Sequence, residues 1–182
     1  MGCGPSKKEL SGVAEITGMS KKELQDSYKA FKKEAGGSKV KLDKFTKLVA
    51  TMNTNKGGNV TEYAKHMFRV LDTDKDDMVN FREVMIGFHN LSTAGDEKEK
   101  LRMVFEMYDV DGTKTISPEN MKIITRSQYQ LEGKPMNEAE IEAKVKQCFG
   151  LCDLNTDGQI TEEEFYKSGK SIAEMFELEG DE

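Results

Sequence analysis

Apolar residues recur along the chain at helical spacing, in pairs of segments separated by an acidic loop. One segment covers residues 64–71 and its partner covers residues 81–88. In both, the apolar positions stand at i, i+3, i+4 and i+7: Ala64, Met67, Phe68 and Leu71, then Phe81, Val84, Met85 and Phe88. Because this spacing puts each set on one face of a helix, it predicts a helix–loop–helix unit.

The same unit occurs three times with a fixed length. In each, an aromatic residue near the end of the first helix lies eleven residues before an aliphatic residue in the loop. The pairs are Phe68 and Val79, Phe105 and Ile116, and Phe149 and Ile160. Constant spacing of this kind indicates an internal repeat.

A fourth unit precedes these three and has a shorter loop. Ser20 to Glu23 reads SKKE, which has the form of a capping box and predicts the start of a helix. The step from Phe31 to Val40 is nine residues instead of eleven. We therefore expect an all-α fold of four helix–loop–helix units in two pairs, with two-residue β contacts between paired loops.

The fourth loop, residues 153–164, has oxygen-bearing groups at positions 1, 3, 5, 7, 9 and 12, and it resembles the EF-hand calcium loop. That spacing suits calcium, a hard cation that takes about 6–8 oxygen ligands. Gly158 stands at position 6, where the turn requires a positive φ. The expected ligands are Asp153, Asn155, Asp157, the Gln159 carbonyl, Thr161 and Glu164.

The second loop, residues 72–83, has the same pattern with one departure. Asp77 occupies position 6, where glycine belongs, at an expected cost of roughly 1 kcal/mol. We expect it to bind calcium with reduced affinity or altered geometry. The expected ligands are Asp72, Asp74, Asp76, the Met78 carbonyl, Asn80 and Glu83.

The third loop, residues 109–120, carries several defects. Lys114 replaces the glycine of position 6, and Asn120 at position 12 cannot chelate through two carboxylate oxygens. We expect weak or no calcium binding, with magnesium as an alternative weak occupant. Its ligand positions hold Asp109, Asp111, Thr113, Thr115, Ser117 and Asn120.

The first loop, residues 33–44, has no acidic residue at positions 1, 3, 5 or 12. A calcium loop depends on these positions for its charged ligands. We therefore expect this loop to be free of metal and to have a structural role. The chain as a whole should bind calcium at two sites, with the fourth loop dominant.

Charge divides the chain unevenly. Residues 1–65 carry 13 lysines and 7 acidic residues, whereas the remaining residues carry 14 basic and 26 acidic ones, for a net charge of −6 overall. A basic end suits an anionic surface and an acidic end suits cations, although charges can also simply solvate helix faces.

The opening residues MGCGPS have the pattern of an N-myristoylation signal, with Gly2 as the acceptor and Ser6 in the required position. Cys3 is a candidate for palmitoylation. No apolar run is long enough to span a bilayer, and no secretory signal precedes the helices. Three cysteines are too few for a disulfide framework, which favours a reducing, intracellular setting.

These features together resemble the neuronal calcium sensor family, which includes proteins of the recoverin, frequenin and guanylate-cyclase-activating type. The resemblance rests on MGCGPS, FRVLDTDKDDMVNFREVMIGF, EKLRMVFEMYDVDG and DLNTDGQITEEEFYKSG, and it covers nearly the whole chain. Two departures are Ala35-Gly36, where the family usually has Cys-Pro, and the degraded third loop. The family implies two EF-hand pairs, an N-terminal myristoyl group, and a hydrophobic groove that engages target proteins when calcium binds.

From the residues and the resemblance we expect three segments: 1–19 with the lipidation signal and a first helix, 20–92 with one EF-hand pair, and 97–182 with the other. The leading functional hypothesis is a calcium sensor that regulates a target protein, located in the cytoplasm and held at an anionic membrane surface by its lipid. A calcium buffer and a regulatory subunit like calcineurin B are the alternatives.

Catalysis by the chain is not expected. His66 and His89 fall within helical patterns, and no nucleophile forms a recognisable motif with a base and an orienting acid. Cys148 and Cys152 are interpreted as ordinary core or surface thiols. No motif for nucleic-acid binding occurs.

Overall fold

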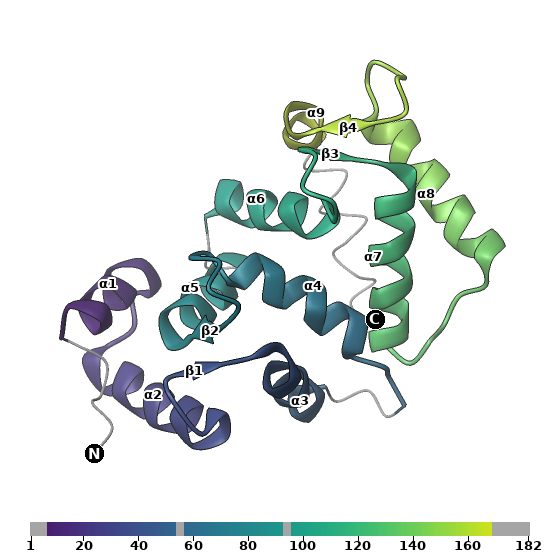
Figure 1. The fold of residues 1–182 in the computed structure, drawn as a ribbon. Helices are drawn as coiled ribbons and strands as arrows, with labels where there is room; N and C mark the ends of the chain where they lie inside the picture. The colour runs from purple at the N-terminus through teal and green to yellow at the C-terminus, as the bar shows by residue number, and fades with distance from the viewer. Residues whose placement is uncertain (1–6, 54–56, 93–95, 169–182) are drawn as a thin grey trace, which may run out of the picture. The chain divides into compact units, whose positions relative to one another are not determined.

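The computed structural model describes residues 7–53, 57–92 and 96–168. Throughout these residues the regular structure is helical except for four two-residue strands (Figure 1). The predicted all-α class is confirmed, and so are the helix–loop–helix units and the short β contacts between their loops. Among the described helices, none combines the length and the apolar character needed to cross a membrane.

Contacts along the described chain separate two units. The first comprises residues 7–53, 60–92 and 96–100, and the second comprises residues 57–59 and 101–168. The division therefore falls inside α6 (Glu97–Tyr108), after Lys100. The three segments expected from the sequence stay a prediction.

The first unit contains two helix pairs and one additional helix at the front. Its elements are α1 (Lys7–Thr17), α2 (Lys21–Ala35), β1 (Lys39–Val40), α3 (Leu42–Met52), α4 (Thr61–Leu71), β2 (Val79–Asn80) and α5 (Phe81–Leu91). The capping box that begins α2 is present, since the Ser20 hydroxyl accepts the Glu23 N–H and the Glu23 carboxylate accepts the Ser20 N–H.

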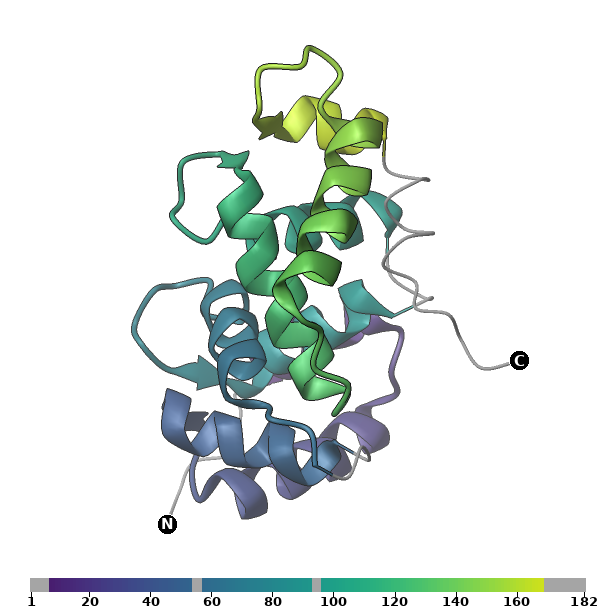
Figure 2. The same cartoon turned by 90° about the vertical axis from the view of Figure 1, so that its right-hand side faces the viewer.

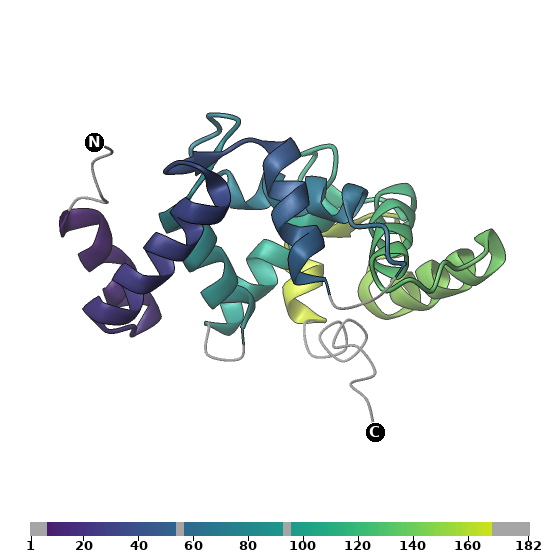
Figure 3. The ribbon, with the colours of Figure 1, turned by 90° about the horizontal axis from the view of Figure 1, so that it is seen from below.

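The additional helix α1 is part of the core of this unit. It packs against α2 and α5, as the view from below shows (Figure 3). Val13 is 1% exposed and lies in one cluster with Leu24, Tyr28 and Phe81. The rings of Tyr28 and Phe81 meet edge to face with centroids 5.2 Å apart. Since burial of one such apolar side chain contributes roughly 1.5–3 kcal/mol, α1 stabilises this unit.

The second unit also contains two helix–loop–helix motifs. Its elements are most of α6, β3 (Thr115–Ile116), α7 (Pro118–Leu131), α8 (Glu138–Cys152), β4 (Ile160–Thr161) and α9 (Glu162–Lys167). Helices α7 and α8 pack side by side (Figure 2). Phe105 of α6 and Phe165 of α9 close the core, with ring centroids 5.5 Å apart.

One antiparallel strand pair joins the two loops within each unit. β1 pairs with β2 so that Lys39 lies opposite Asn80 and Val40 opposite Val79. β3 pairs with β4 so that Ile116 lies opposite Ile160. The aliphatic residues that mark the repeat in the sequence are therefore direct partners across the strands. Each pairing fixes the position of one loop relative to its neighbour.

Candidate calcium-binding loops

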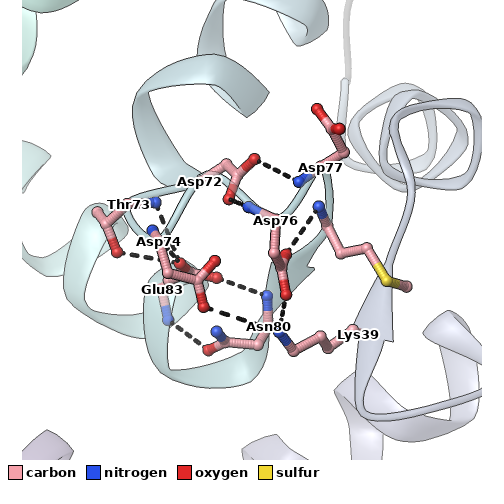
Figure 4. A network of polar contacts seen from close by, with 9 residues as sticks. Lys39, Asp72, Thr73, Asp74, Asp76, Asp77, Asn80 and Glu83 are labelled. Atoms are coloured by element: carbon pink, nitrogen blue, oxygen red, sulfur yellow. Dashed lines mark hydrogen bonds and ion pairs between the residues drawn. The ribbon is translucent and has the colours of Figure 1, made fainter.

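The carboxylate at position 1 organises the beginning of the second loop (Figure 4). Asp72, which is 9% exposed, accepts the Asp76 N–H through Oδ1 at 3.1 Å and the Asp77 N–H through Oδ2 at 3.0 Å. Both bonds turn the chain back on itself. The turn brings one carboxylate oxygen each from Asp72, Asp74 and Asp76 within 4.8 Å of one another.

The carboxylate at position 12 reaches across the second loop to its beginning. Glu83 is 5% exposed, and its Oε1 accepts the N–H of Thr73 at 3.1 Å and the N–H of Asp74 at 3.4 Å. Its Oε2 accepts the Asn80 N–H at 2.9 Å. Both oxygens are thus held at the loop, beside the three aspartates. Carboxylate oxygens gathered in this way form a donor set that fits a hard divalent cation such as calcium.

The fourth loop has the same arrangement. Asp153 accepts the N–H groups of Asp157 and Gly158 at 3.2 and 2.9 Å. Glu164 Oε1 accepts the N–H of Leu154 and of Asn155 at 3.1 and 3.2 Å, and Oε2 accepts from the Thr161 N–H and hydroxyl. The hydrogen bonds from Thr161 lower the pKa of Glu164 and favour its charged form. This donor set fits calcium as well.

The third loop keeps the first half of the arrangement and lacks the second. Asp109 accepts the N–H groups of Thr113 and Lys114 at 2.9 and 3.1 Å, as the first aspartate does in the other two loops. Asn120 at position 12 is 5% exposed, and its Nδ2 has no hydrogen-bond partner among the described residues. An amide at this position therefore does not substitute for the carboxylate that joins the two ends of the other loops.

Position 6 has a left-handed backbone in all three loops. The φ angles are 60° at Asp77, 64° at Lys114 and 82° at Gly158. Position 4 has the same geometry in all three loops, with φ of 55° at Lys75, 70° at Gly112 and 60° at Thr156. The turns therefore hold several non-glycine side chains in a conformation that favours glycine.

Lys39, which the ligand spacing does not predict, also lies at the second loop. Its Nζ forms an ion pair and hydrogen bond with Asp76 Oδ2 and lies 3.7 Å from Asp74 Oδ2 (Figure 4). The bond to Asp76 raises the pKa of Lys39 and lowers the pKa of Asp76. The signal that could have revealed it is the pairing of Val40 with Val79, because this register brings residue 39 beside the loop.

The first unit also has an apolar pocket on its α2, α3 and α5 helices. Met52, at the end of α3, is 66% exposed beside it. The pocket is lined mostly by Ala30, Phe31, Phe45, Leu48, Val49, Met52, Val84 and Phe88. An exposed apolar surface of this kind is typical of a protein-binding groove.

The remaining predicted residues lie outside these loops. Gly2 and Cys3, the predicted lipidation residues, lie outside the described residues. Cys148 and Cys152 are buried in α8, and burial raises the pKa of both thiols to about 11. Both therefore stay protonated at neutral pH, which makes them poor metal ligands.

Comparison with known proteins identifies relatives of this chain. A model of the EF-hand domain pair matches residues 98–168, which include the third and fourth loops. Human recoverin is 30% identical over 181 aligned residues, which cover 95% of this chain and 88% of recoverin. The similarity therefore extends over both units.

Proposed function

The chain belongs to the neuronal calcium sensor family of EF-hand calcium-binding proteins, and from this premise we propose that it is a calcium sensor that regulates a target protein. It is homologous to recoverin, a calcium sensor. The observation that carries the proposal is the position-12 carboxylate in two loops, Glu83 and Glu164, each held by N–H groups from the opposite end of its loop. The second and fourth loops are the calcium sites, with the fourth dominant. The third is weak for calcium or takes magnesium.

Calcium titration of two variants tests the site assignment. Glu164→Gln should remove one calcium equivalent, because position 12 supplies two oxygens of the expected ligand set. Glu163→Gln is the matched control: Glu163 is a neighbouring exposed acid that pairs with Lys167, and its loss should leave the stoichiometry unchanged. If Glu164→Gln binds as many calcium ions as the wild type in isothermal titration, the assignment is wrong.

The apolar pocket of the first unit offers a surface for a target protein, which a sensor needs and a buffer does not. A sensor exposes apolar surface when calcium binds, whereas a buffer barely opens. The 11 methionines support the same function, since flexible thioether side chains adapt to varied partner helices. We propose that the target binds in this pocket, and that the chain acts on its partner without catalysing a reaction itself.

Retention on phenyl-Sepharose distinguishes the two functions. Calcium should increase retention over that in chelator, and Met52→Gln should reduce the increase while the calcium stoichiometry stays constant. Ile16→Gln removes another exposed apolar side chain, 43% exposed on α1 outside the pocket, and should have less effect. Retention that does not respond to calcium would favour a buffer. A permanently bound regulatory subunit would instead co-purify with one enzyme in chelator.

We also propose a cytoplasmic location with peripheral attachment to membranes. The supporting observations are the Gly2 and Cys3 signals and the 13 lysines among residues 1–65. A single myristoyl chain binds membranes only marginally, so a second signal is needed for stable attachment. Lysines near an anionic leaflet contribute roughly 1 kcal/mol each and can serve as that signal.

A further inference from the structure

A positively charged side chain, that of Lys39, lies at the second loop. Lys39 Nζ pairs with Asp76 Oδ2 and lies 3.7 Å from Asp74 Oδ2. Asp74 and Asp76 stand at positions 3 and 5 and belong, with Asp72, to the carboxylate cluster whose oxygens lie within 4.8 Å of one another. The ammonium group therefore binds oxygens that the proposed function assigns to calcium.

Backbone pairing fixes the position of this lysine, which belongs to the first helix–loop–helix unit (the first hand: α2, β1 and α3). Lys39 stands in β1, whose antiparallel pairing with β2 puts it opposite Asn80, at position 9 of the second loop. Val40 and Val79, the neighbouring pair, are 2% and 0% exposed and hold the register from the core side. Lys39 belongs to the first loop, which is expected to bind no metal, and it contacts Asp76 in the second loop, 37 residues later in the sequence.

We propose that Lys39 sets the calcium affinity of the second loop by acting as an internal competing cation. The inference rests on the proposed calcium site in that loop. In the calcium-free form the ammonium group offsets the repulsion among the clustered carboxylates. Asp76 Oδ2 cannot bind calcium while it holds the Lys39 ammonium group, so the ion pair favours the calcium-free form. Stabilising one side of an equilibrium lowers apparent affinity by the same factor.

The first hand thereby acquires a function that its sequence does not show. Without ligands, it controls the calcium concentration at which the neighbouring hand fills. Most exposed ion pairs contribute little, and this pair matters because one partner belongs to the calcium donor set. Removal of the lysine should raise the calcium affinity of the second loop about fivefold, the upper end of what an exposed ion pair supplies.

The test is calcium titration of the full-length chain in a Glu164→Gln background, which silences the fourth loop. A calcium-binding step lost on further substitution of Glu83→Gln is assigned to the second loop. Lys39→Met should tighten this step about fivefold, and Lys39→Arg, which keeps the charge, should stay close to the parent. The gain should shrink at high salt, because salt screens exposed charges.

Lys47→Met is the matched control. Lys47 lies on the exposed face of α3 in the same unit, so this variant loses the same charge away from the loop. Its affinity should change less than about twofold. Thermal unfolding in chelator checks that each variant folds. Lys39→Met should lower the melting temperature slightly, since it removes a pair that stabilises the calcium-free form.

The outcomes separate the inference from the function on which it rests. If the second-loop step is present and Lys39→Met leaves its affinity unchanged, or if Lys47→Met raises the affinity equally, the competing-cation role is wrong and the calcium site stands. If no step is assignable to the second loop, either in the parent protein or in its Lys39→Met variant, both fail. A step that appears only in Lys39→Met supports the inference.

Discussion

At the scale of single residues, position 6 of the second and third loops places a residue with a side chain in a left-handed backbone conformation that favours glycine. Lys114 has a φ of 64° and Asp77 a φ of 60°. A left-handed conformation costs an ordinary L-residue roughly 1–2 kcal/mol, whereas Asp tolerates it better. Glycine removes this strain but loses more conformational freedom on folding, by roughly 0.5–1 kcal/mol. At Asp77 the strain that glycine would remove is nearly equal to the entropy that it would lose. At Lys114 the strain is greater than this loss of entropy.

Lys114→Gly should therefore stabilise the calcium-free protein by about 0.5–1 kcal/mol, while Asp77→Gly should change the free energy of unfolding by less than about 0.5 kcal/mol. Urea unfolding in chelator measures both. Lys114→Ala is the control, because it removes the long side chain and keeps the Cβ that causes the strain. If the alanine variant gains as much stability as the glycine variant, the gain comes from loss of the lysine side chain and the strain argument is wrong.

His66 is a second residue whose environment predicts a measurable effect. It is 4% exposed on α4, and its Nε2 has no hydrogen-bond partner among the described residues. Burial lowers its pKa below the ordinary value of 6.5, so the folded state favours the neutral ring. The unfolded chain then binds more protons than the folded chain in the window just below pH 6.5. Its contribution to stability is complete above that pH and is lost as the pH falls through the window.

In chelator, the free energy of unfolding should consequently decrease as the pH falls from 7.5 to 5.5, by at most about 1.4 kcal/mol per pH unit for one proton. His66→Gln should flatten this decrease, since glutamine stays neutral throughout. His89→Gln, which removes the other histidine of the chain, shows whether the effect is specific to His66. A His66→Gln variant with the same pH dependence as the wild type would show that other groups cause the decrease.

At the scale of elements, the second, third and fourth loops share the eleven-residue spacing but differ in how much of one hydrogen-bond arrangement they keep. All three use the first aspartate to bind N–H groups at positions 5 and 6. Only the second and fourth also join their two ends through position 12. The aspartate at position 1 therefore forms the turn by hydrogen bonds alone. The residue at position 12 determines whether the two ends of the loop are joined and its carboxylate oxygens come together.

Repair of the third loop follows from this comparison. Lys114→Gly combined with Asn120→Glu should give it measurable calcium affinity, because the new carboxylate can accept N–H groups from the loop's beginning, as Glu83 and Glu164 do, and supply two ligand oxygens. Isothermal titration should show one additional calcium equivalent.

Glu119→Gln, one residue away in the first turn of α7, controls for a general change of charge and should add no site. If the wild-type third loop already binds calcium as tightly as the fourth, the interpretation of its defects is wrong.

The extent to which the sequence predicts these elements depends on how local their determinants are. Ligand spacing within one loop is a property of twelve consecutive residues, so the sequence alone is enough to propose donor sets in the second and fourth loops. The pairing of Val40 with Val79 follows from the repeat. The packing of Val13 into the core depends on contacts between distant segments, whereas the position of Lys39 could have been inferred from the pairing of Val40 with Val79. Spacing alone does not contain the Val13 contacts. The left-handed fourth position has a glycine only in the third loop, at Gly112, whereas Lys75 and Thr156 occupy it in the other two and give no such signal.

At the scale of the whole molecule, the division of charge is the feature that bears on location. Residues 1–65 carry an excess of six positive charges, and the rest of the chain carries an excess of twelve negative charges. Such a chain should approach an anionic leaflet with its N-terminal residues, while its acidic part stays in solution and binds calcium. The predicted lipidation residues, Gly2 and Cys3, stand at the basic end, so the two proposed membrane signals would act on the same part of the chain.

Membrane attachment should therefore require both signals. Gly2→Ala should release the protein to the soluble fraction, because lysines on a folded domain seldom hold it at physiological salt. Cys3→Ser should leave a weaker attachment that salt disrupts, carried by one acyl chain and the lysines. Sedimentation of the acylated protein and of its variants with liposomes, at low and high salt and with and without anionic lipid, measures both effects. If binding ignores salt and lipid charge alike, the lysines only solvate helix faces, and the attachment depends on acyl chains alone.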